Sequence, residues 1–242
     1  MKQLITSIML LLALYQTKAQ TADFKNSRTF LSSSTFPLPK GVTQIKVELW
    51  GGGGGGCAYG GGGGGAYGRA ILNVSEFSSV QIVVGSGGRG GLETGTDGGI
   101  TLVRFNTTSS ATTYSFSVRP GSGAVIGSSL VQGGEGGVGA VMTPNDIGYY
   151  FEAGEDGTFY LDSYRQIGTA TITTRNYGKG GNAGNTIYTG GRGGVYASDR
   201  SAVWDNHSEQ RYGSSGKLPG GGGGGNKGTG FNGASGMVIV SW

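Results

Sequence analysis

The sequence predicts an all-β protein, in which a sandwich or jelly-roll-like sheet carries packed polyglycine-II helices. Three observations lead to this fold class. Short segments alternate between apolar and polar residues, glycine-rich stretches lie between them, and no segment has the apolar spacing of an amphipathic helix. Short strands with glycine-rich connections are typical of sandwiches and jelly rolls. The sequence leaves the order of the strands open.

Several segments have the composition of β-strands. The clearest is residues 43–50, where Ile45, Val47 and Leu49 alternate with larger polar or aromatic residues. The other expected strands are residues 67–74, 80–84, 100–105, 114–118, 169–174 and 237–242. We expect the strand at 43–50 and the one at 237–242 to lie close together, because this pairing would tie the end of the chain into the sheet.

Glycine accounts for 54 of the 242 residues. It forms unbroken runs at 51–56, 60–65 and 220–225, and elsewhere it recurs every third residue, as at Gly85, Gly88 and Gly91. A polyglycine-II helix has three residues per turn and no internal hydrogen bonds, so its backbone groups need partners on neighbouring chains. Such close approach requires residues without a Cβ atom. A flexible linker is the alternative, but linkers join domains, whereas these runs flank expected strands.

The first residues have the pattern of a secretory signal peptide. Lys2 precedes an apolar run from residue 4 to residue 14, and Thr17 and Ala19 are the small residues before an expected cleavage site. The run is too short for a transmembrane helix, and no other segment is long enough. We therefore expect a signal peptide at 1–19, an N-terminal extension at 20–35 and a single glycine-rich β domain at 36–242, in a protein that is secreted or displayed on the cell surface.

Charge and cysteine content exclude some classes of function. The formal net charge is +4 and only 13% of residues are charged, with the arginines scattered along the chain. Nucleic-acid binding requires clustered basic residues, so we expect no nucleic-acid partner. Cys57 is the single cysteine and cannot form an internal disulfide. We expect it to be a small, partly buried apolar residue, and intermolecular pairing of a free thiol stays open.

Residues for catalysis or for a cofactor are sparse. His207 is the only histidine, and its neighbours Asp205 and Ser208 do not by themselves make a catalytic triad. One cysteine and one histidine do not provide a zinc site. The glycine runs lack the P-loop pattern, because Gly228 follows Lys227 where Ser or Thr is required. An acidic cluster at residues 152–162 is either a solvated turn or a calcium site. We expect no enzyme activity, cofactor or metal.

Several motifs occur in a characteristic order. VELW followed by six glycines ends at Gly56, AYGRAILNV ends at Val74, VQIVVGSGGRGG ends at Gly91, and GASGMVIVSW ends at Trp242. This ordered set resembles the glycine-rich domain family, which includes adhesins of phage tail-fibre tips and is similar to the glycine-rich extracellular region of anaplastic lymphoma kinase receptors. The resemblance implies a jelly-roll-like unit that carries polyglycine-II helices, with variable loops that bind a receptor. Residues 106–215 depart from the pattern.

Two aromatic-rich insertions, at about 143–165 and 195–213, supply the candidate ligand-binding residues. Tyr, Trp and Arg dominate recognition surfaces, and Tyr adds contact area at low entropic cost. The candidates are Tyr149, Tyr150, Phe151, Tyr160 and Tyr164 in the first insertion, and Tyr196, Arg200, Trp204, Asp205, His207 and Tyr212 in the second. For the first insertion, a role of the aromatic residues in the core stays open.

These features predict a recognition or adhesion module. Its expected partner is a surface glycan or an envelope or matrix protein, because aromatic rings beside Asp, Asn and Arg suit sugar faces and hydroxyl groups. Two alternatives remain. The protein is a self-assembling structural component of a matrix or envelope, for which exposed sheet edges would suffice, or it is an ice-binding protein.

Overall fold

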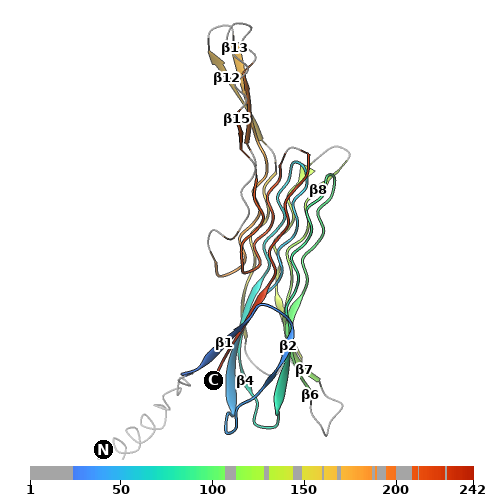
Figure 1. Ribbon diagram of the computed structural model, residues 1–242. Helices are drawn as coiled ribbons and strands as arrows, with labels where there is room; N and C mark the ends of the chain where they lie inside the picture. Colours follow the sequence, from blue (N-terminus) through green and yellow to red (C-terminus); the bar gives the residue numbers. More distant parts are fainter. Residues whose placement is uncertain are drawn as a thin grey trace, which may run out of the picture.

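The computed structural model describes residues 24–106, 113–127, 131–143, 149–159, 161–167, 170–186, 189, 195–199, 209–211, 213–226 and 228–242. These residues contain strands and irregular segments but no helix, which confirms the predicted all-β class. Figure 1 shows an elongated molecule with a β-sandwich at one end, long glycine-rich segments in the middle and a small sheet at the other end. We call the end away from the sandwich the distal end.

Two five-stranded antiparallel sheets form the sandwich. The first has the order β1-β16-β3-β4-β11 and the second has the order β10-β7-β6-β5-β2. The strands of the first sheet are β1 (Ser27–Phe30), β16 (Met237–Ser241), β3 (Gln44–Trp50), β4 (Tyr67–Asn73) and β11 (Tyr149–Glu152). Those of the second are β10 (Ala140–Thr143), β7 (Thr113–Val118), β6 (Thr101–Asn106), β5 (Ser79–Val83) and β2 (Ser34–Pro37).

The sheet topology confirms the expected neighbourhood of the first strong strand and the last one. β3 and β16 pair directly, with Trp50 opposite Met237 and Leu49 opposite Val238. Next to them, the N–H of Asn26 donates to the carbonyl of Trp242 and the N–H of Trp242 donates back, both over 3.0 Å. The first described residues and Trp242 therefore lie together at the sandwich end (Figure 1).

The core lies between the two sheets and follows from the alternation in the sequence. Ile45, Val47 and Leu49 are fully buried and pack in one cluster with Phe116 of the second sheet. Burying one such side chain contributes about 1.5–3 kcal/mol. Gly68 allows Phe116 and Val118 to pack closely against β4, because a Cβ atom at this position would clash with their side chains.

The sheets begin earlier than the sequence pattern indicated. Residues 27–35 were assigned to an N-terminal extension, but β1 pairs with β16 along its whole length and β2 pairs with β5. Phe30 and Phe36 are buried and their ring centroids lie 5.6 Å apart. Both strands are short edge strands with mostly exposed residues. Their sequences therefore lack the alternation of apolar and polar residues from which a strand can be predicted.

The middle of the molecule is a bundle of extended segments, which we call the glycine lattice (Figure 1). Some segments run away from the sandwich and the others run back towards it. In the order of the chain they are residues 51–57, 60–66, 85–91, 95–99, 119–124, 133–139, 153–158, 178–184, 213–217, 220–225 and 230–236. Their backbone hydrogen bonds run between segments rather than within them.

The lateral hydrogen bonds repeat every third residue. In the first segment, the N–H groups of Gly51, Gly54 and Cys57 donate to the segment 60–66. Those of Gly52 and Gly55 donate to the segment 95–99, and the remaining two glycines donate to the segment 230–236. A chain with three residues per turn directs successive N–H groups to three different neighbours. The pattern fits the predicted polyglycine-II packing, although the helix type of each segment stays a prediction.

The central segments are surrounded on all sides. Segment 51–57 donates to three neighbours and accepts hydrogen bonds from three more, which are segments 85–91, 119–124 and 220–225. At Gly54 a Cβ atom would overlap the carbonyl of Ser122, and at Gly63 it would overlap the carbonyl of Glu135. Peripheral segments face neighbours on only some sides. Glycine is therefore continuous in the central runs and intermittent at the periphery.

Side-chain oxygens satisfy N–H groups at the periphery of the lattice. The N–H of Gly123 donates to Asp97 over 2.8 Å, and the N–H of Gly136 donates to Asp156 over 2.7 Å. Thr96, Thr158 and Asn232 accept backbone N–H groups in the same way. These acceptors matter because an N–H group without a partner costs free energy as it leaves water.

Two smaller sheets occupy the distal end. One is the pair β8 (Val125–Ile126) and β9 (Val131–Gln132), and the other has the order β12-β13-β14-β15. The strands of this distal sheet are β12 (Leu161–Ile167), β13 (Ala170–Asn176), β14 (Val195–Asp199) and β15 (Glu209–Arg211). The expected strand at 169–174 corresponds to β13. No apolar helix of membrane-spanning length occurs among the described residues.

Candidate functional site

The aromatic residues of the first predicted insertion separate into two places. Tyr149, Tyr150 and Phe151 belong to β11 in the sandwich. The chain then crosses the lattice along residues 153–158 and reaches the distal end at Phe159, just before β12. Six residues of extended chain, at up to about 3.3 Å per residue, span on the order of 20 Å. The insertion therefore does not form a single binding loop.

The remaining candidates belong to the distal end or lie outside the described residues. Tyr164 is in β12 and Tyr196 is in β14, so both are carried by the distal sheet. The candidates that lie outside the described residues are Tyr160, Arg200, Trp204, Asp205, His207 and Tyr212.

The aromatic residues of β11 lie at the surface rather than in the core. Tyr150 is 50% exposed, and Tyr149 and Phe151 are also exposed. The reason is their position, since β11 pairs with β4 at the edge of the first sheet. Tyr149 lies opposite Ala70 and Tyr150 lies opposite Arg69. At an edge, residues on both faces of the strand keep part of their surface in solvent.

β4 and β11 together form a shallow hollow of about 270 Å³, lined by Arg69, Ala70, Ile71, Tyr149 and Tyr150. We call this the edge surface. The guanidinium carbon of Arg69 lies 5.7 Å from the ring centroid of Tyr150, which is a cation–π distance. The ring of Tyr149 packs inward against Phe116, with centroids 5.7 Å apart. The hollow thus combines an arginine with two partly anchored aromatic rings.

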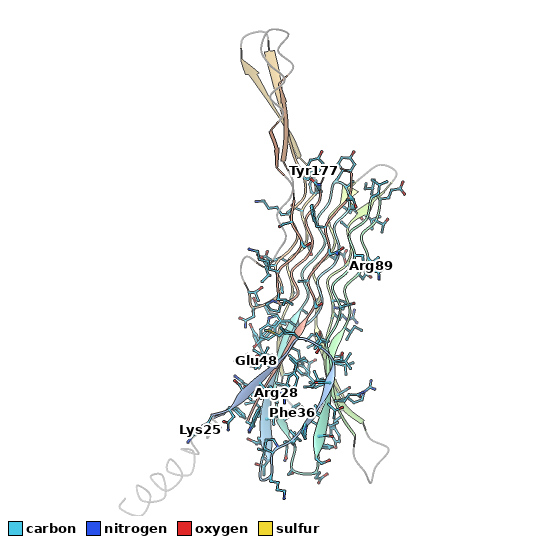
Figure 2. All side chains as sticks on the ribbon, viewed as in Figure 1. Lys25, Arg28, Phe36, Glu48, Arg89 and Tyr177 are labelled. Carbon is cyan, nitrogen blue, oxygen red and sulfur yellow. The ribbon has the colours of Figure 1, made fainter. Side chains whose placement is uncertain are left out.

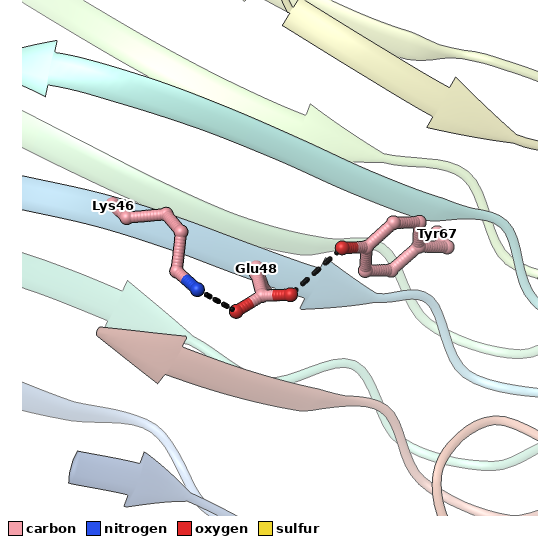
Figure 3. Close-up of polar contacts among 3 residues, drawn as sticks. All are labelled: Lys46, Glu48 and Tyr67. Carbon is pink, nitrogen blue, oxygen red and sulfur yellow. Dashed lines mark hydrogen bonds and ion pairs between the residues drawn. The ribbon is translucent and has the colours of Figure 1, made fainter. Parts of the chain in front are cut away.

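Beside the edge surface, a polar chain crosses β3 and β4 (Figure 3). The hydroxyl of Tyr67 donates to Oε1 of Glu48 over 2.8 Å, and Nζ of Lys46 lies 2.9 Å from Oε2 of Glu48. Tyr67 is buried, and its ring contacts that of Tyr150 edge-on with centroids 6.2 Å apart. Burial, followed by the hydrogen bond to Glu48, raises the pKa of the Tyr67 hydroxyl well above its ordinary value. Tyr67 therefore supports Tyr150 as a neutral donor.

The same tyrosine helps to join the sandwich to the lattice. Trp50 and Tyr67 pack with ring centroids 4.9 Å apart, and both bury against Ala183 of the lattice segment 178–184. The indole N–H of Trp50 donates to the carbonyl of Gly184 over 3.1 Å. Because this bond is buried and spans distant parts of the chain, it fixes where the segment meets the sheet.

A second cluster of exposed apolar residues lies where the lattice segments turn at the distal end. It consists of Tyr59, Leu92, Val125 and Phe159, and we call it the distal surface. Leu92 is 60% exposed and Phe159 is 55% exposed. In Figure 2, Tyr177 marks this end of the lattice, far from Lys25 and Phe36 in the sandwich.

Hydrogen bonds and ring contacts connect the turns of the distal surface. The N–H of Ala58 donates to the carbonyl of Leu92 over 3.0 Å, and a β-bridge joins Thr94 to Val125. Tyr59 stacks on Tyr177 with centroids 6.0 Å apart. Sequence reasoning missed Tyr59 and Leu92, because a single apolar residue in a glycine-rich turn has no periodic signal.

The acidic cluster takes part in the structure of the lattice. Glu155 accepts the side-chain amide of Asn182 over 2.7 Å, and Asp156 accepts the N–H of Gly136. Glu152 lies in β11, apart from both. Among the described residues, no group of three His, Cys, Asp or Glu side chains is arranged to hold a metal ion. Cys57 is buried, and its Sγ atom accepts the N–H of Gly60 over 3.2 Å.

Comparison with models of known protein families identifies a match. A family model described as a glycine-rich domain matches residues 28–242, which include all the strands of the sandwich from Arg28 onward as well as the lattice and the distal sheet. The search of curated proteins finds no match.

Proposed function

Because the chain belongs to the glycine-rich domain family, we propose that it is a recognition module that binds a surface ligand, such as a glycan or an envelope component, through its distal end. The observation that supports this proposal is the gathering of exposed apolar side chains on the distal surface, next to the distal sheet. Exposed apolar patches on a folded protein mark interaction sites.

The lattice suits the role of a rigid spacer. Each central segment is tied to its neighbours by hydrogen bonds at successive residues, so it cannot bend without breaking several of them. The sandwich holds both Asn26 and Trp242 at the opposite end. A ligand bound at the distal surface would thus be held at a distance from the sandwich, which suits an adhesion module.

The test is binding of the purified protein to a glycan array and to a panel of intact cells. We expect selective binding that the Leu92→Ser and Phe159→Ala variants weaken about tenfold or more, as for residues that dominate an interface. Leu31→Ser is the matched control, because Leu31 is also an exposed leucine but lies at the sandwich end. Equal loss in Leu31→Ser, or unchanged binding in both distal variants, would contradict the distal assignment.

The predicted residues of the second insertion are tested in the same assay. If that insertion contacts the ligand, Trp204→Ala weakens binding together with the distal variants. Unchanged binding in Trp204→Ala would remove this insertion from the site, while the distal surface would stand on Leu92→Ser and Phe159→Ala.

Self-association is a second candidate function, and one observation favours it. β11 is an edge strand with three exposed aromatic residues, and unprotected edges pair with other chains. Sedimentation over a range of protein concentrations, without any ligand, checks it. Assembly that Tyr150→Lys abolishes would support a structural role, whereas a monomer at all concentrations would remove it. Thermal hysteresis of the same sample checks the ice-binding alternative.

A further inference from the structure

We propose that the edge surface is a second binding site, separate from the distal surface, and that it takes a sugar ring that carries a carboxylate. The inference rests on the proposed function in one respect, that the ligand class is a glycan. Its location and its selectivity rest on Arg69 and its neighbours, so it can succeed or fail independently of the distal surface.

Arg69 provides the anion-binding group. Within the described part of the chain, no carboxylate lies at ion-pair distance from its guanidinium, although it lines the hollow between β4 and β11. The facing residue on β3 is Glu48, but its two carboxylate oxygens already bind Lys46 and Tyr67. A guanidinium offers a planar fork of N–H donors that matches a carboxylate with two parallel hydrogen bonds.

The rest of the hollow suits a single sugar ring. Its volume of about 270 Å³ is just below the size of pockets for drug-sized ligands. Ile71, Tyr149 and Tyr150 are exposed and line it. Ile71 and Tyr150 lie on the same face of the sheet as Arg69, so the C–H face of a pyranose can pack on these two side chains while its hydroxyl groups remain in solvent. Aromatic residues with a fixed ring position make such contacts at low entropic cost.

The charges around Arg69 do not form a positive patch that would attract every anion. The charged groups close to Tyr150 and Arg69 are Lys46, Glu48, Arg69 itself and Glu152, and two of them are positive and two negative. Glu152 is engaged by Tyr150, whose hydroxyl lies 3.3 Å from Oε2. Preference for an acidic sugar would therefore come from paired hydrogen bonds to Arg69, and Glu152 remains able to accept a sugar hydroxyl.

The experiment is titration of the purified protein with galacturonic acid and, separately, with galactose, followed by calorimetry or by NMR at low ionic strength. For a ligand of this size we expect a Kd of about 1 mM for the acid, with galactose at least about tenfold weaker, since a hydrogen bond to a charged group is worth about that factor. Arg69→Ala should weaken binding of the acid about tenfold or more. Arg69→Lys, which keeps the charge and loses the fork, should be weakened as well.

Arg28→Ala is the matched control. Arg28 is an exposed arginine in β1 of the same sheet, 5.1 Å from the ring of Phe30, and its loss should leave the Kd unchanged. Equal affinity for galactose, loss of binding in Arg28→Ala, or no saturable binding of the acid would each overturn the proposal. Leu92→Ser should bind the acid normally. If Leu92→Ser loses binding to cells but still binds galacturonic acid, the two sites are distinct. If the parent protein binds cells through the distal surface but does not bind galacturonic acid, the proposal for the edge surface fails and the proposal for the distal surface is unaffected.

Discussion

The N–H of Gly54 donates to the carbonyl of Gly63 over 2.8 Å, and this bond joins the two central glycine runs of the lattice. The carbonyl of Gly54 in turn accepts the N–H of Gly223 from the third run. The three unbroken glycine runs of the sequence are thus neighbours in space. Their composition follows from this contact, since each run is enclosed by other backbones.

Gly54→Ala should destabilise the protein by about 3 kcal/mol or more, because the new methyl group would overlap the carbonyl of Ser122 and force the segments apart. Denaturant unfolding measures the change. Ser86→Ala is the control, since Ser86 is an exposed position of a peripheral segment and should change stability by no more than about 0.5 kcal/mol. Equal stability of the Gly54→Ala variant and the parent would contradict the close packing described above.

Asp156→Ala should lower stability by about 1 kcal/mol, because the N–H of Gly136 would lose its acceptor. Asp156→Asn keeps a carbonyl oxygen in the same place and should restore most of this loss. Thermal unfolding of both variants measures the difference. A loss of equal size in Asp156→Asn would assign the effect to charge rather than to the hydrogen bond.

Tyr67→Phe should reduce stability by about 1 kcal/mol at neutral pH, since Glu48 loses a hydrogen-bond donor. The pKa of Tyr67 is raised in the folded protein, mainly by burial. Its neutral form therefore contributes stability that is fully present below the unfolded-state pKa of about 10 and is lost as the pH rises above it. Unfolding curves of the parent and Tyr67→Phe should converge above about pH 10. Parallel pH profiles would contradict this linkage.

Cys57 should resist thiol reagents in the folded protein. The side chain is buried at the turn between two glycine runs, so modification requires local opening. With a chromogenic disulfide we expect a reaction at least about 100-fold slower than in concentrated guanidinium, where the thiol is free. Fast modification of Cys57 under native conditions would contradict this prediction and would favour a thiol that is available for an intermolecular disulfide.

Strands with a strong period of two were predictable from the sequence, and they match the structure within a few residues. The segments at 43–50 and 237–242 became β3 and β16, and their pairing followed from the expectation that the end of the chain is tied into the sheet. The edge strands β1, β2 and β11 were not predicted as strands. Their residues are mostly exposed, so there is no buried face to impose alternation.

The candidate site was predictable in its residue types but not in its arrangement. The sequence singled out Tyr149, Tyr150 and Phe151, which are indeed exposed. It grouped them with Tyr164, which the lattice holds at the other end of the molecule. Arg69 was not predicted as a site residue, because the hollow that it lines is formed together with residues of β11, which are distant in the sequence.

The sequence by itself determined the all-β class, the strong strands and the need for close backbone packing, since alternation and the absence of Cβ atoms are local properties of the chain. Tertiary structure alone decided which segments are neighbours and which side chains share a surface. The physical reason is that hydrogen bonds in the lattice, such as the one between Gly54 and Gly223, join residues far apart in the chain. Every backbone can offer these bonds, and only the packing of the whole molecule selects the partners.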